Sequence, residues 1–598
     1  MGSGLCAGDR SRDSRNARAT RGYRYGAPLI MGTSALLFSN IEDDDSKDPN
    51  GKTRTEKMLE LSRQQIQEEM SSRRDKLGPV LKFLVKYIWD PLATWFRFFE
   101  LLALFSPVLI TGVPLLVGVT PTFYRNFWYK FLVKVMDLAG PSFIKLGQWA
   151  ASRSDIFPAE LIGYMSQLHS HAQRHSMSHT RRVVMESFGK PFEECFEEFD
   201  ESPLGVGAMG QVYRARYRSP EYSGDVAVKV LHPNVDIKVT RDLKIMMIFA
   251  KMINTLPTME WLSLPGEVET FGRMMLSQMD LRLEAENLHI FNQNFSNDSD
   301  ISFPKAPLKV STRELLVEQL VVGVSMEKVL EFCQHKEYDR IVAKLGLDAF
   351  LKMLLLHNFI HSDLHAGNIF LSIDGPHHSS EKLEKLNAAQ TQEEWDAVWD
   401  HLSPQKDRPH LWFIDAGLVT ELNPGNRANF VALFKAIATF DGYQAGQLMM
   451  ERSRTPETVV NRELFALRTE RLVNQVKKRT FALGSVGIGD LLATMMDMVR
   501  QHHVRMESDF VTVVLSILLL EGIGRRLDPD LDIFKAALPV LRKVSQHQAV
   551  SSLPADLSTD DILQMLKAWI VLETRQFINA SVQEVYQCVK YDRLSPNT

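Results

Sequence analysis

The chain has 598 residues, of which 45% are hydrophobic and 24% are charged, the proportions of an ordinary globular protein. A chain of this length exceeds one compact domain and is expected to hold roughly two to four structural units. Its formal net charge of -4 argues against a generally basic nucleic-acid binder, so we expect no nucleic-acid partner. Its 4 cysteines show no paired spacing, which argues against a disulfide framework or a zinc ribbon and favours a reducing compartment.

The N-terminal segment is rich in arginine. Residues 1–40 hold six arginines, several serines and only two acidic residues, a composition typical of a mitochondrial presequence. A disordered basic tail is the alternative. We expect residues 1–50 to form a presequence and linker. Residues 56–76 are mostly helix formers with a weak apolar stripe, which predicts a solvent-exposed surface helix.

The next segment, residues 51–135, is expected to be helical and membrane-associated. No charged residue occurs between Glu100 and Arg125, and at about 1.5 Å per residue this run is long enough to cross a bilayer. Aromatic residues gather on both flanks, as in interfacial belts. The alternative is a pair of buried helices broken at Pro114. We expect a transmembrane helix.

The following half of the chain changes from strand-like to helical patterns. Short β-branched runs occur at 226–231 and 314–323, and helical periodicity dominates from Tyr338 onward. A smaller β-rich unit followed by a larger α-rich one is the order of a two-lobed fold. Residues 375–410 are polar and predict an insertion with one helix around 393–401.

A glycine-rich run is the first candidate for phosphate binding, because glycines let the backbone approach phosphates. The candidate nucleotide-binding residues are Gly205, Val206, Gly207, Ala208, Met209, Gly210 and Val212. Alone the run is weak evidence, since glycine triplets also mark turns. Lys229, in a strand-like Val-Ala-Val-Lys segment, is expected to contact phosphates, and it needs a carboxylate partner. Glu284 is the preferred partner and Glu286 the rival.

Two later motifs complete a kinase-like constellation. The sequence His361-Ser-Asp-Leu-His-Ala-Gly-Asn368 has the spacing of a protein-kinase catalytic loop. In it, Asp363 would orient the phosphate acceptor, and Asn368 would hold a metal ion. Asp415 follows an apolar strand and precedes Ala-Gly, the arrangement of a magnesium-binding Asp-x-Gly. The order of these elements predicts a catalytic site with ATP and Mg²⁺ as cofactors.

Several motifs together resemble the UbiB family, the aarF-domain atypical kinases of mitochondria, plastids and bacteria. They are Lys145-Leu-Gly-Gln148, the segment 280–287, the loop 361–368 and the segment 521–530. The resemblance implies an α+β, atypical protein-kinase-like two-lobed fold with an N-terminal helical extension. The expected units are a Lys-x-Gly-Gln extension at 136–199, an N-lobe with a helical insertion at 200–325, and a C-lobe at 326–598 that carries the polar insertion.

The resemblance also implies function. Lys145, Gln148 and Asp280 are expected in an extension that folds over the nucleotide site and occupies space that a protein substrate would need. The family supports coenzyme Q biosynthesis or lipid homeostasis, and its members show ATPase behaviour more readily than protein phosphorylation. We therefore expect an ATPase or a small-molecule or lipid kinase in the mitochondrion, associated with a membrane that is expected to be the inner one. Its expected partners are a nucleotide, membrane lipids or quinone precursors, and coenzyme Q biosynthetic proteins.

Two alternatives remain open at this level. One is a nucleotide-gated scaffold or lipid chaperone that transfers no phosphate. The other, a kinase similar to choline or aminoglycoside kinases, is disfavoured because those enzymes lack the Lys145 motif. The chain departs from the family pattern at Gly205 and Gly207, where alanines are usual, and at Gln278, where a glutamate is usual. His171, His175 and His179 have a spacing that could bind a metal, but their polar surroundings favour a linker.

Overall fold

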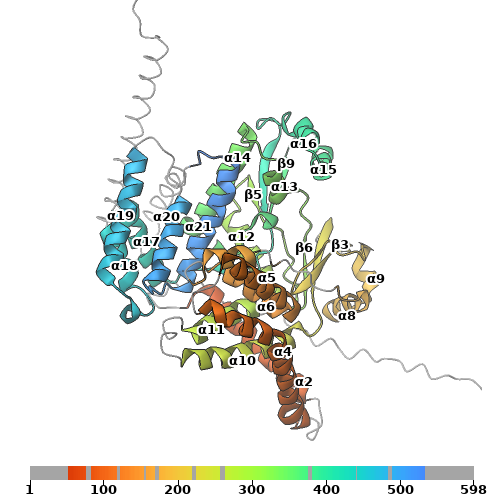
Figure 1. The fold of residues 1–598 in the computed structure, drawn as a ribbon. Helices are drawn as coiled ribbons and strands as arrows, with labels where there is room; N and C mark the ends of the chain where they lie inside the picture. The colour runs from red at the N-terminus through yellow and green to blue at the C-terminus, as the bar shows by residue number, and fades with distance from the viewer. Residues whose placement is uncertain are drawn as a thin grey trace, which may run out of the picture.

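The computed structural model describes most of the chain between Lys52 and Leu531. The described ranges are 52–75, 83–116, 121–153, 156–166, 168, 174–218, 224–255, 263–374, 380–438, 441–481 and 488–531. The expected presequence lies outside these residues, as does the end of the expected C-lobe after Leu531. Within the described ranges the fold is a small β-rich lobe, a large α-rich lobe, and a helical layer contributed by the N-terminal part of the chain (Figure 1).

The small lobe is built on a five-stranded antiparallel sheet with the order β1-β3-β4-β6, to which β2 adds beside β3. Its strands are β1 (Phe196–Phe199), β2 (Gly205–Val206), β3 (Gly210–Tyr217), β4 (Asp225–Leu231) and β6 (Leu315–Gln319). Because side chains alternate across a strand, Val226, Val228 and Val230 pack on one face. That face is covered by α8 (Met177–Phe188) and α9 (Phe192–Cys195). Lys229 therefore projects from the opposite face.

Three helices of the small lobe cover the face from which Lys229 projects. They are α10 (Val235–Asn254), α11 (Leu264–Ser277) and α12 (Leu281–Asn294). Apolar residues of all three helices form one core with Leu231 and Leu316 of the sheet. The extra pair α10 and α11 is the helical insertion that the sequence predicts between Lys229 and Glu284.

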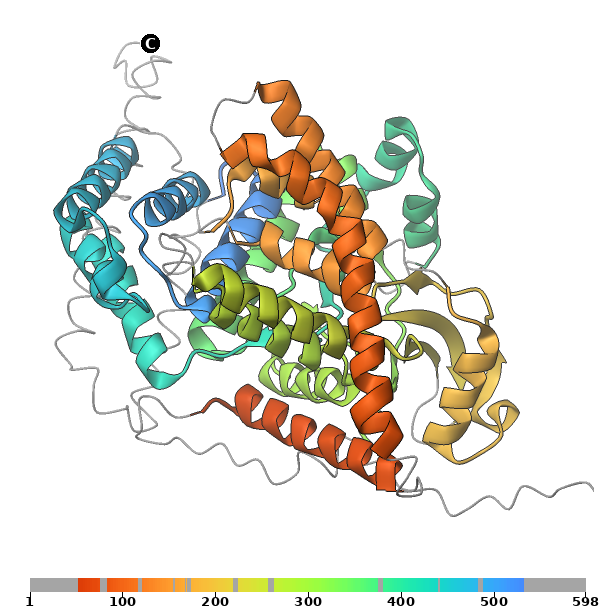
Figure 2. The same ribbon diagram turned by 60° about the horizontal axis from the view of Figure 1, so that its bottom comes forward.

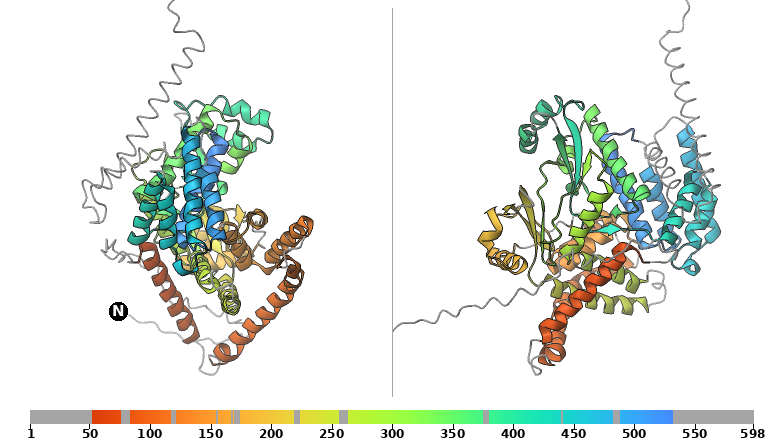
Figure 3. Two further views of the ribbon diagram at one scale, coloured as in Figure 1. Left: turned by 60° about the vertical axis from the view of Figure 1, so that its left-hand side comes forward. Right: turned by 180° about the vertical axis from the view of Figure 1, so that it is seen from behind.

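The large lobe combines a four-stranded sheet, ordered β5-β10-β9-β7, with a two-stranded ribbon of β8 and β11 (Figure 3). The strands are β5 (Ile301–Ser302), β7 (Val324–Ser325), β8 (Ile360–His361), β9 (Ile369–Asp374), β10 (Arg408–Phe413) and β11 (Val419–Thr420). The helices are α13 (Met326–Glu331), α14 (Glu337–Leu351), η3 (Lys352–Leu356), η4 (Ala366–Asn368), α17 (Pro424–Ala438), α18 (Gly442–Glu451), η5 (Pro456–Thr458), α19 (Arg462–Phe481), α20 (Ile488–Gln501) and α21 (Ser508–Leu527).

The polar insertion holds two helices, α15 (Ser380–Ala388) and α16 (Gln392–Trp399). The sequence predicted α16 and missed α15. Trp395 and Trp399 stack 4.8 Å apart and are buried in the main core of the large lobe. The insertion is therefore a packed part of the lobe and owes its place to these two aromatic side chains.

The N-terminal layer runs across the small lobe (Figure 2). Its elements are α2 (Arg54–Asp75), η1 (Val85–Trp89), α4 (Asp90–Leu116), α5 (Thr122–Ala139), α6 (Pro141–Ala151) and α7 (Ala159–Met165). The expectation that residues 56–76 form a solvent-exposed helix is wrong. Met58 and Ser62 of α2 are each 1% exposed, and Ser62 Oγ donates a 2.5 Å hydrogen bond to Asp280.

Among the described residues, one helix is long and apolar enough to cross a membrane, Tyr87–Leu115. The uncharged run after Glu100 is divided between two helices, because α4 ends at Leu116 and α5 begins at Thr122. The alternative of a helix pair is therefore partly met, with the break after Pro114, while the candidate membrane helix itself continues through Pro107 and Pro114. Most of its large apolar side chains are exposed, including Phe96 and Ile110. Its first half is tied to α10, because Arg97 Nε donates a 2.8 Å hydrogen bond to the buried Asp242.

Candidate active site

Lys229 lies at the centre of the cleft between the lobes. From β4 its Nζ reaches both carboxylate oxygens of Glu284 on α12, each at 2.9 Å, and Oδ1 of Asp415 at 3.0 Å. The rival carboxylate, Glu286, instead accepts from Arg54 of α2 at 3.4 Å. The structure thus resolves the choice that the sequence left open in favour of Glu284. Lys229, Glu284 and Asp415 thereby connect β4, α12 and the large lobe.

The charges in this contact are unequal. Burial disfavours the charged form of Lys229, but the Asp415 and Glu284 carboxylates outweigh burial and raise its pKa. Lys229 in turn holds the pKa of Asp415 well below its usual range. Burial raises the pKa of Glu284 despite the pull of Lys229, and the Asp415 charge acts in the same direction as burial. Asp415 is therefore the carboxylate whose charged form Lys229 stabilises most.

Glu318 is a functional candidate that the sequence analysis missed. It lies in β6 opposite Ala227 of β4, so its side chain is on the same face of the sheet as Lys229. Glu318 is 9% exposed, and its Oε2 accepts no hydrogen bond from the described residues. Burial, together with the Glu284 charge, raises the pKa of Glu318 to about 8. Its only sequence signal is an acidic residue inside the apolar run Leu315-Leu-Val.

Asp415 is presented by a strained turn. It follows β10 with φ +58, a left-handed conformation that a residue with a Cβ seldom adopts outside functional sites. The turn is fastened from α12, because Asn287 Nδ2 donates a 2.8 Å hydrogen bond to the carbonyl oxygen of Ala416. The Asp415 side chain is 44% exposed, so it remains open to a ligand.

The catalytic loop joins β8 to β9 beside this turn. His361 is buried, its Nδ1 accepts from the Asp363 N–H at 3.3 Å, and its Nε2 donates to the Ile414 carbonyl oxygen at 3.0 Å. Burial lowers the pKa of His361, which fits the neutral ring that these two bonds require. His361 thereby fixes Asp363 relative to the strand that delivers Asp415.

Asn368 and Asp415 are the candidate metal ligands. Asn368 Nδ2 donates to the Asp363 carbonyl oxygen at 2.9 Å, which leaves its side-chain oxygen for a cation. Nowhere in the described ranges do three His, Cys, Asp or Glu side chains gather in a metal-binding arrangement. This pair still fits Mg²⁺, which commonly takes one or two protein carboxylates and completes its shell with phosphates and water.

The glycine-rich loop forms a tight turn between β2 and β3. Gly207 N donates to the Gly210 carbonyl oxygen at 2.9 Å. A Cβ at Gly210 would lie 2.4 Å from the Val230 carbonyl oxygen, so only glycine fits there. Gly205 has no atom within 4 Å of such a Cβ, and at Gly207 the nearest atom is 3.6 Å away. These two positions leave room for a ligand at the backbone.

The extension lies beside the cleft. Lys145 on α6 is close enough to Asp415 to help lower the pKa of that carboxyl group, after the larger effect of Lys229. Gln148 Nε2 donates to the Leu168 carbonyl oxygen at 3.0 Å and so orders the extension itself. Gly147 is needed for the same packing, because a Cβ there would lie 2.1 Å from Leu168 Cδ1.

Asp280 caps α12, the helix that carries Glu284. Its Oδ1 accepts from the Arg282 backbone N–H at 3.1 Å, and both of its oxygens accept from the Arg282 guanidinium group. In this arrangement Asp280 fixes the start of α12, while Lys145 acts at the cleft. The structure therefore separates two residues that the sequence analysis grouped in one role.

Comparison with known proteins agrees with this geometry. The ABC1 atypical kinase-like domain matches residues 167–449, and the UbiB helical domain matches residues 472–532. A mitochondrial ABC1 family protein of Saccharomyces cerevisiae is 43% identical over 92% of this chain and 91% of its own length. A mitochondrial ABC1 family protein of Schizosaccharomyces pombe is 36% identical over 91% of this chain and 83% of its own length.

Bacterial proteins are more distant. The "Probable protein kinase UbiB" of Tolumonas auensis is 25% identical over 68% of this chain and 69% of its own length. The similarity to the yeast proteins extends over nearly the whole chain and includes the N-terminal layer. The chain belongs to the ABC1/UbiB family of atypical kinase-like proteins.

Proposed function

We propose that the protein binds ATP with Mg²⁺ and acts as an ATPase or as a kinase of a small molecule or lipid. The observation that carries the proposal is the contact of Lys229 with both Glu284 and Asp415. In kinases, the corresponding lysine–glutamate pair and metal-binding aspartate must both be in place for phosphoryl transfer.

The cleft residues divide the work. Lys229 would bind phosphate oxygens while Glu284 holds it in position, and Asn368 and Asp415 would hold the metal ion. When bound, Mg²⁺ neutralises charge on the phosphate oxygens. Asp363 would orient a hydroxyl group or a water molecule for attack. The protein's contribution is mainly positioning and preorganised charge.

The covering of the cleft supports a small acceptor. The helices α6, α10 and α11 pack together over the sheet face that carries Lys229, and Lys145 of α6 affects Asp415 directly. An extended peptide needs an open surface beside the phosphates. We therefore infer that the acceptor is water or a small hydroxyl group, which disfavours protein substrates.

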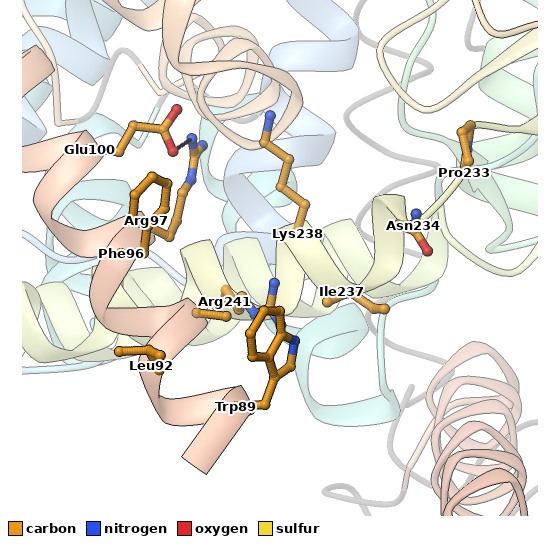
Figure 4. Close-up of a pocket in the computed structure, with 11 residues that line it drawn as sticks. Trp89, Leu92, Phe96, Arg97, Glu100, Pro233, Asn234, Ile237, Lys238 and Arg241 are labelled. Atoms are coloured by element: carbon orange, nitrogen blue, oxygen red, sulfur yellow. Dashed lines mark ion pairs between the residues drawn. The ribbon is translucent and has the colours of Figure 1, made fainter. Parts of the chain in front are cut away.

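A groove beside the candidate membrane helix supports contact with lipids. It has a volume of about 520 Å³ and lies between α4 and α10 (Figure 4). Trp89 of η1 and Leu92 and Phe96 of α4 line one side of it, while Lys238 and Arg241 line it from α10. An apolar wall beside cationic side chains suits a phospholipid. We propose the mitochondrial inner membrane as the location, and coenzyme Q biosynthesis or lipid metabolism as the process, with quinone precursors and biosynthetic proteins as partners.

The test is phosphate release by the purified full chain in lipid nanodiscs with ATP and Mg²⁺. We expect Asp363→Asn and Asp415→Asn to lower the rate by at least about 100-fold, the usual scale for loss of one positioned catalytic group. Hydrolysis that persists unchanged in both variants would contradict the proposal. Stabilisation of the wild type by nucleotide without any turnover would favour the scaffold alternative.

A further inference from the structure

A chain of histidines ends on the glycine-rich loop. His232, just after β4, lies with its Nε2 3.0 Å from the Gly207 carbonyl oxygen. Its Nδ1 lies 2.8 Å from Nδ1 of His175, whose Nε2 is 3.0 Å from Thr180 Oγ1. His175 belongs to the histidine series of the sequence, whereas His232 had no signal there. The pair connects the start of α8 to the loop expected to hold phosphates.

The hydrogen bonds fix the protons of this network. Within the described residues His232 Nε2 faces the Gly207 carbonyl oxygen, so this nitrogen donates, and in the neutral ring His232 Nδ1 accepts. His175 Nδ1 must then donate to His232, and His175 Nε2 accepts from the Thr180 hydroxyl group. Thr180 in turn can accept from Tyr213. This assignment has both rings neutral, and burial favours it, because burial lowers the pKa of His232 and lowers the pKa of His175 to about 4.

The geometry does not suit a metal. Two nitrogens that share one zinc ion lie roughly 3.3 Å apart, given bonds of about 2.0 to 2.1 Å and tetrahedral angles. The 2.8 Å between His175 and His232 is a hydrogen-bond distance. His179 bonds elsewhere, with its Nε2 3.0 Å from the Leu231 carbonyl oxygen. His171 lies outside the described residues.

The bond to Gly207 sets the direction of one peptide plane. In a trans peptide the carbonyl oxygen and the next N–H point in opposite directions. When His232 holds the Gly207 carbonyl oxygen, the Ala208 N–H is turned away from His232. Ala208 is 3% exposed, and its N–H donates to no group in the described part of the chain. A buried backbone donor without a partner is rare, and at a glycine-rich turn it is suited to an anion.

We propose that His232, held in its tautomer by His175, is a positioning residue that orients the Gly207–Ala208 peptide so that the Ala208 N–H binds a phosphate oxygen of the nucleotide. The inference rests on the proposed function, because it needs a nucleotide in the cleft. It explains why Gly207, where a Cβ would lie no closer than 3.6 Å to another atom, has its carbonyl group held by a side chain.

The experiment measures binding of MgATP and of adenosine to the full chain in nanodiscs by isothermal titration calorimetry. We expect His232→Phe to weaken MgATP binding about 10- to 100-fold, the scale of one hydrogen bond to a charged group, and to change adenosine binding less than about 3-fold. His175→Phe should have a smaller effect in the same direction. His232→Gln, which can still donate to Gly207, should recover most of the affinity.

The matched control is His179→Phe, which removes a ring bonded to Leu231 beside the same cluster and leaves the loop untouched. We expect it to bind MgATP like the wild type. A folded His232→Phe protein with wild-type MgATP affinity would overturn the inference, as would equal losses for MgATP and adenosine. Binding of MgATP by the wild type without hydrolysis would refute only the catalytic proposal, whereas no binding at all would refute both.

Discussion

Two cations, the buried Arg97 and the half-buried Lys229, show how differently this protein treats a structural contact and a functional one. Arg97 on α4 is paired with Asp242, which also accepts from the Ser142 hydroxyl group at 2.6 Å, so the charges and hydrogen bonds of that contact are satisfied. Lys229 in the cleft instead shares one charge among Glu284, Asp415 and the nearby Glu318, whose Oε2 has no hydrogen-bond partner among the residues that the structure describes. The cleft is left with three carboxyl groups around one cation, two of them with raised pKa values, and with an open acceptor. Such a site is prepared for a cation or a ligand.

The helix α6 connects these two regions. At its start Ser142 bonds to Asp242, and one turn later Lys145 acts on Asp415. The side chains that fasten the N-terminal layer and the residue that reaches the cleft therefore lie on one short helix. Substitutions at the Arg97–Asp242 contact and in the Lys229 cleft test whether the two regions have separate roles.

The largest effect on stability is expected at the α4–α10 contact. Arg97→Met leaves Asp242 buried without its cation, and we expect the free energy of unfolding to fall by about 3 to 5 kcal/mol in urea titrations. Arg214→Met, which removes an exposed pair with Asp225, should cost less than about 1 kcal/mol. Similar losses for both variants would show that Arg97 is not the structural anchor described above.

A smaller effect is expected on α6 itself. Gly147→Ala places a Cβ 2.1 Å from Leu168 Cδ1, and overpacking of this kind costs about 1 to 3 kcal/mol. The matched change is Gly163→Ala in α7, where a Cβ meets nothing within 4 Å. It should stabilise the protein by a few tenths to about 1 kcal/mol, because alanine favours helix over glycine. Thermal unfolding of the two variants should shift in opposite directions, and shifts of the same sign would refute this packing.

The smallest stability effect is expected at Glu318 and depends on pH. The folded-state pKa of about 8 lies above the value for an unfolded glutamate, so the folded state binds more protons between these values. The contribution of Glu318 to stability therefore decreases as the pH rises toward 8. The free energy of unfolding of Glu318→Gln should exceed that of the wild type by about 1 to 2 kcal/mol at pH 8, and by less at pH 5. A difference in stability between the two proteins that grows toward low pH would contradict the raised pKa of Glu318.

The sequence alone predicted candidate site residues where the chemistry requires several residues at a fixed spacing. The catalytic loop and the Asp415 turn are short motifs whose residues act together, so their order predicted a nucleotide and metal site. The change from strand-like to helical patterns and the family resemblance predicted the two lobes. Glu284 and Glu286 point in different directions from α12, and only the structure shows which of them reaches Lys229. Glu318 and His232 are single residues in ordinary strand ends, with no partner at a fixed separation.

The helix α2 shows the opposite limitation. Besides the apolar packing of Met58, its contacts with α12 include polar ones, Ser62 to Asp280 and Arg282 to Gln65, between residues more than 200 positions apart. An apolar stripe therefore underestimates its burial. The helix α15 was missed for a similar reason, because the polar composition of the insertion conceals that Leu383 and Leu386 pack into the core.

The central claim is that the three carboxyl groups around Lys229 mark a site for nucleotide and metal. The most direct measurement compares the thermal unfolding of wild type, Asp415→Asn and Arg97→Met, each with and without ATP and Mg²⁺. We expect the ligands to raise the melting temperature of the wild type and of Arg97→Met by similar amounts, and to have little effect on Asp415→Asn. Equal ligand-induced shifts in the wild type and Asp415→Asn would contradict the account.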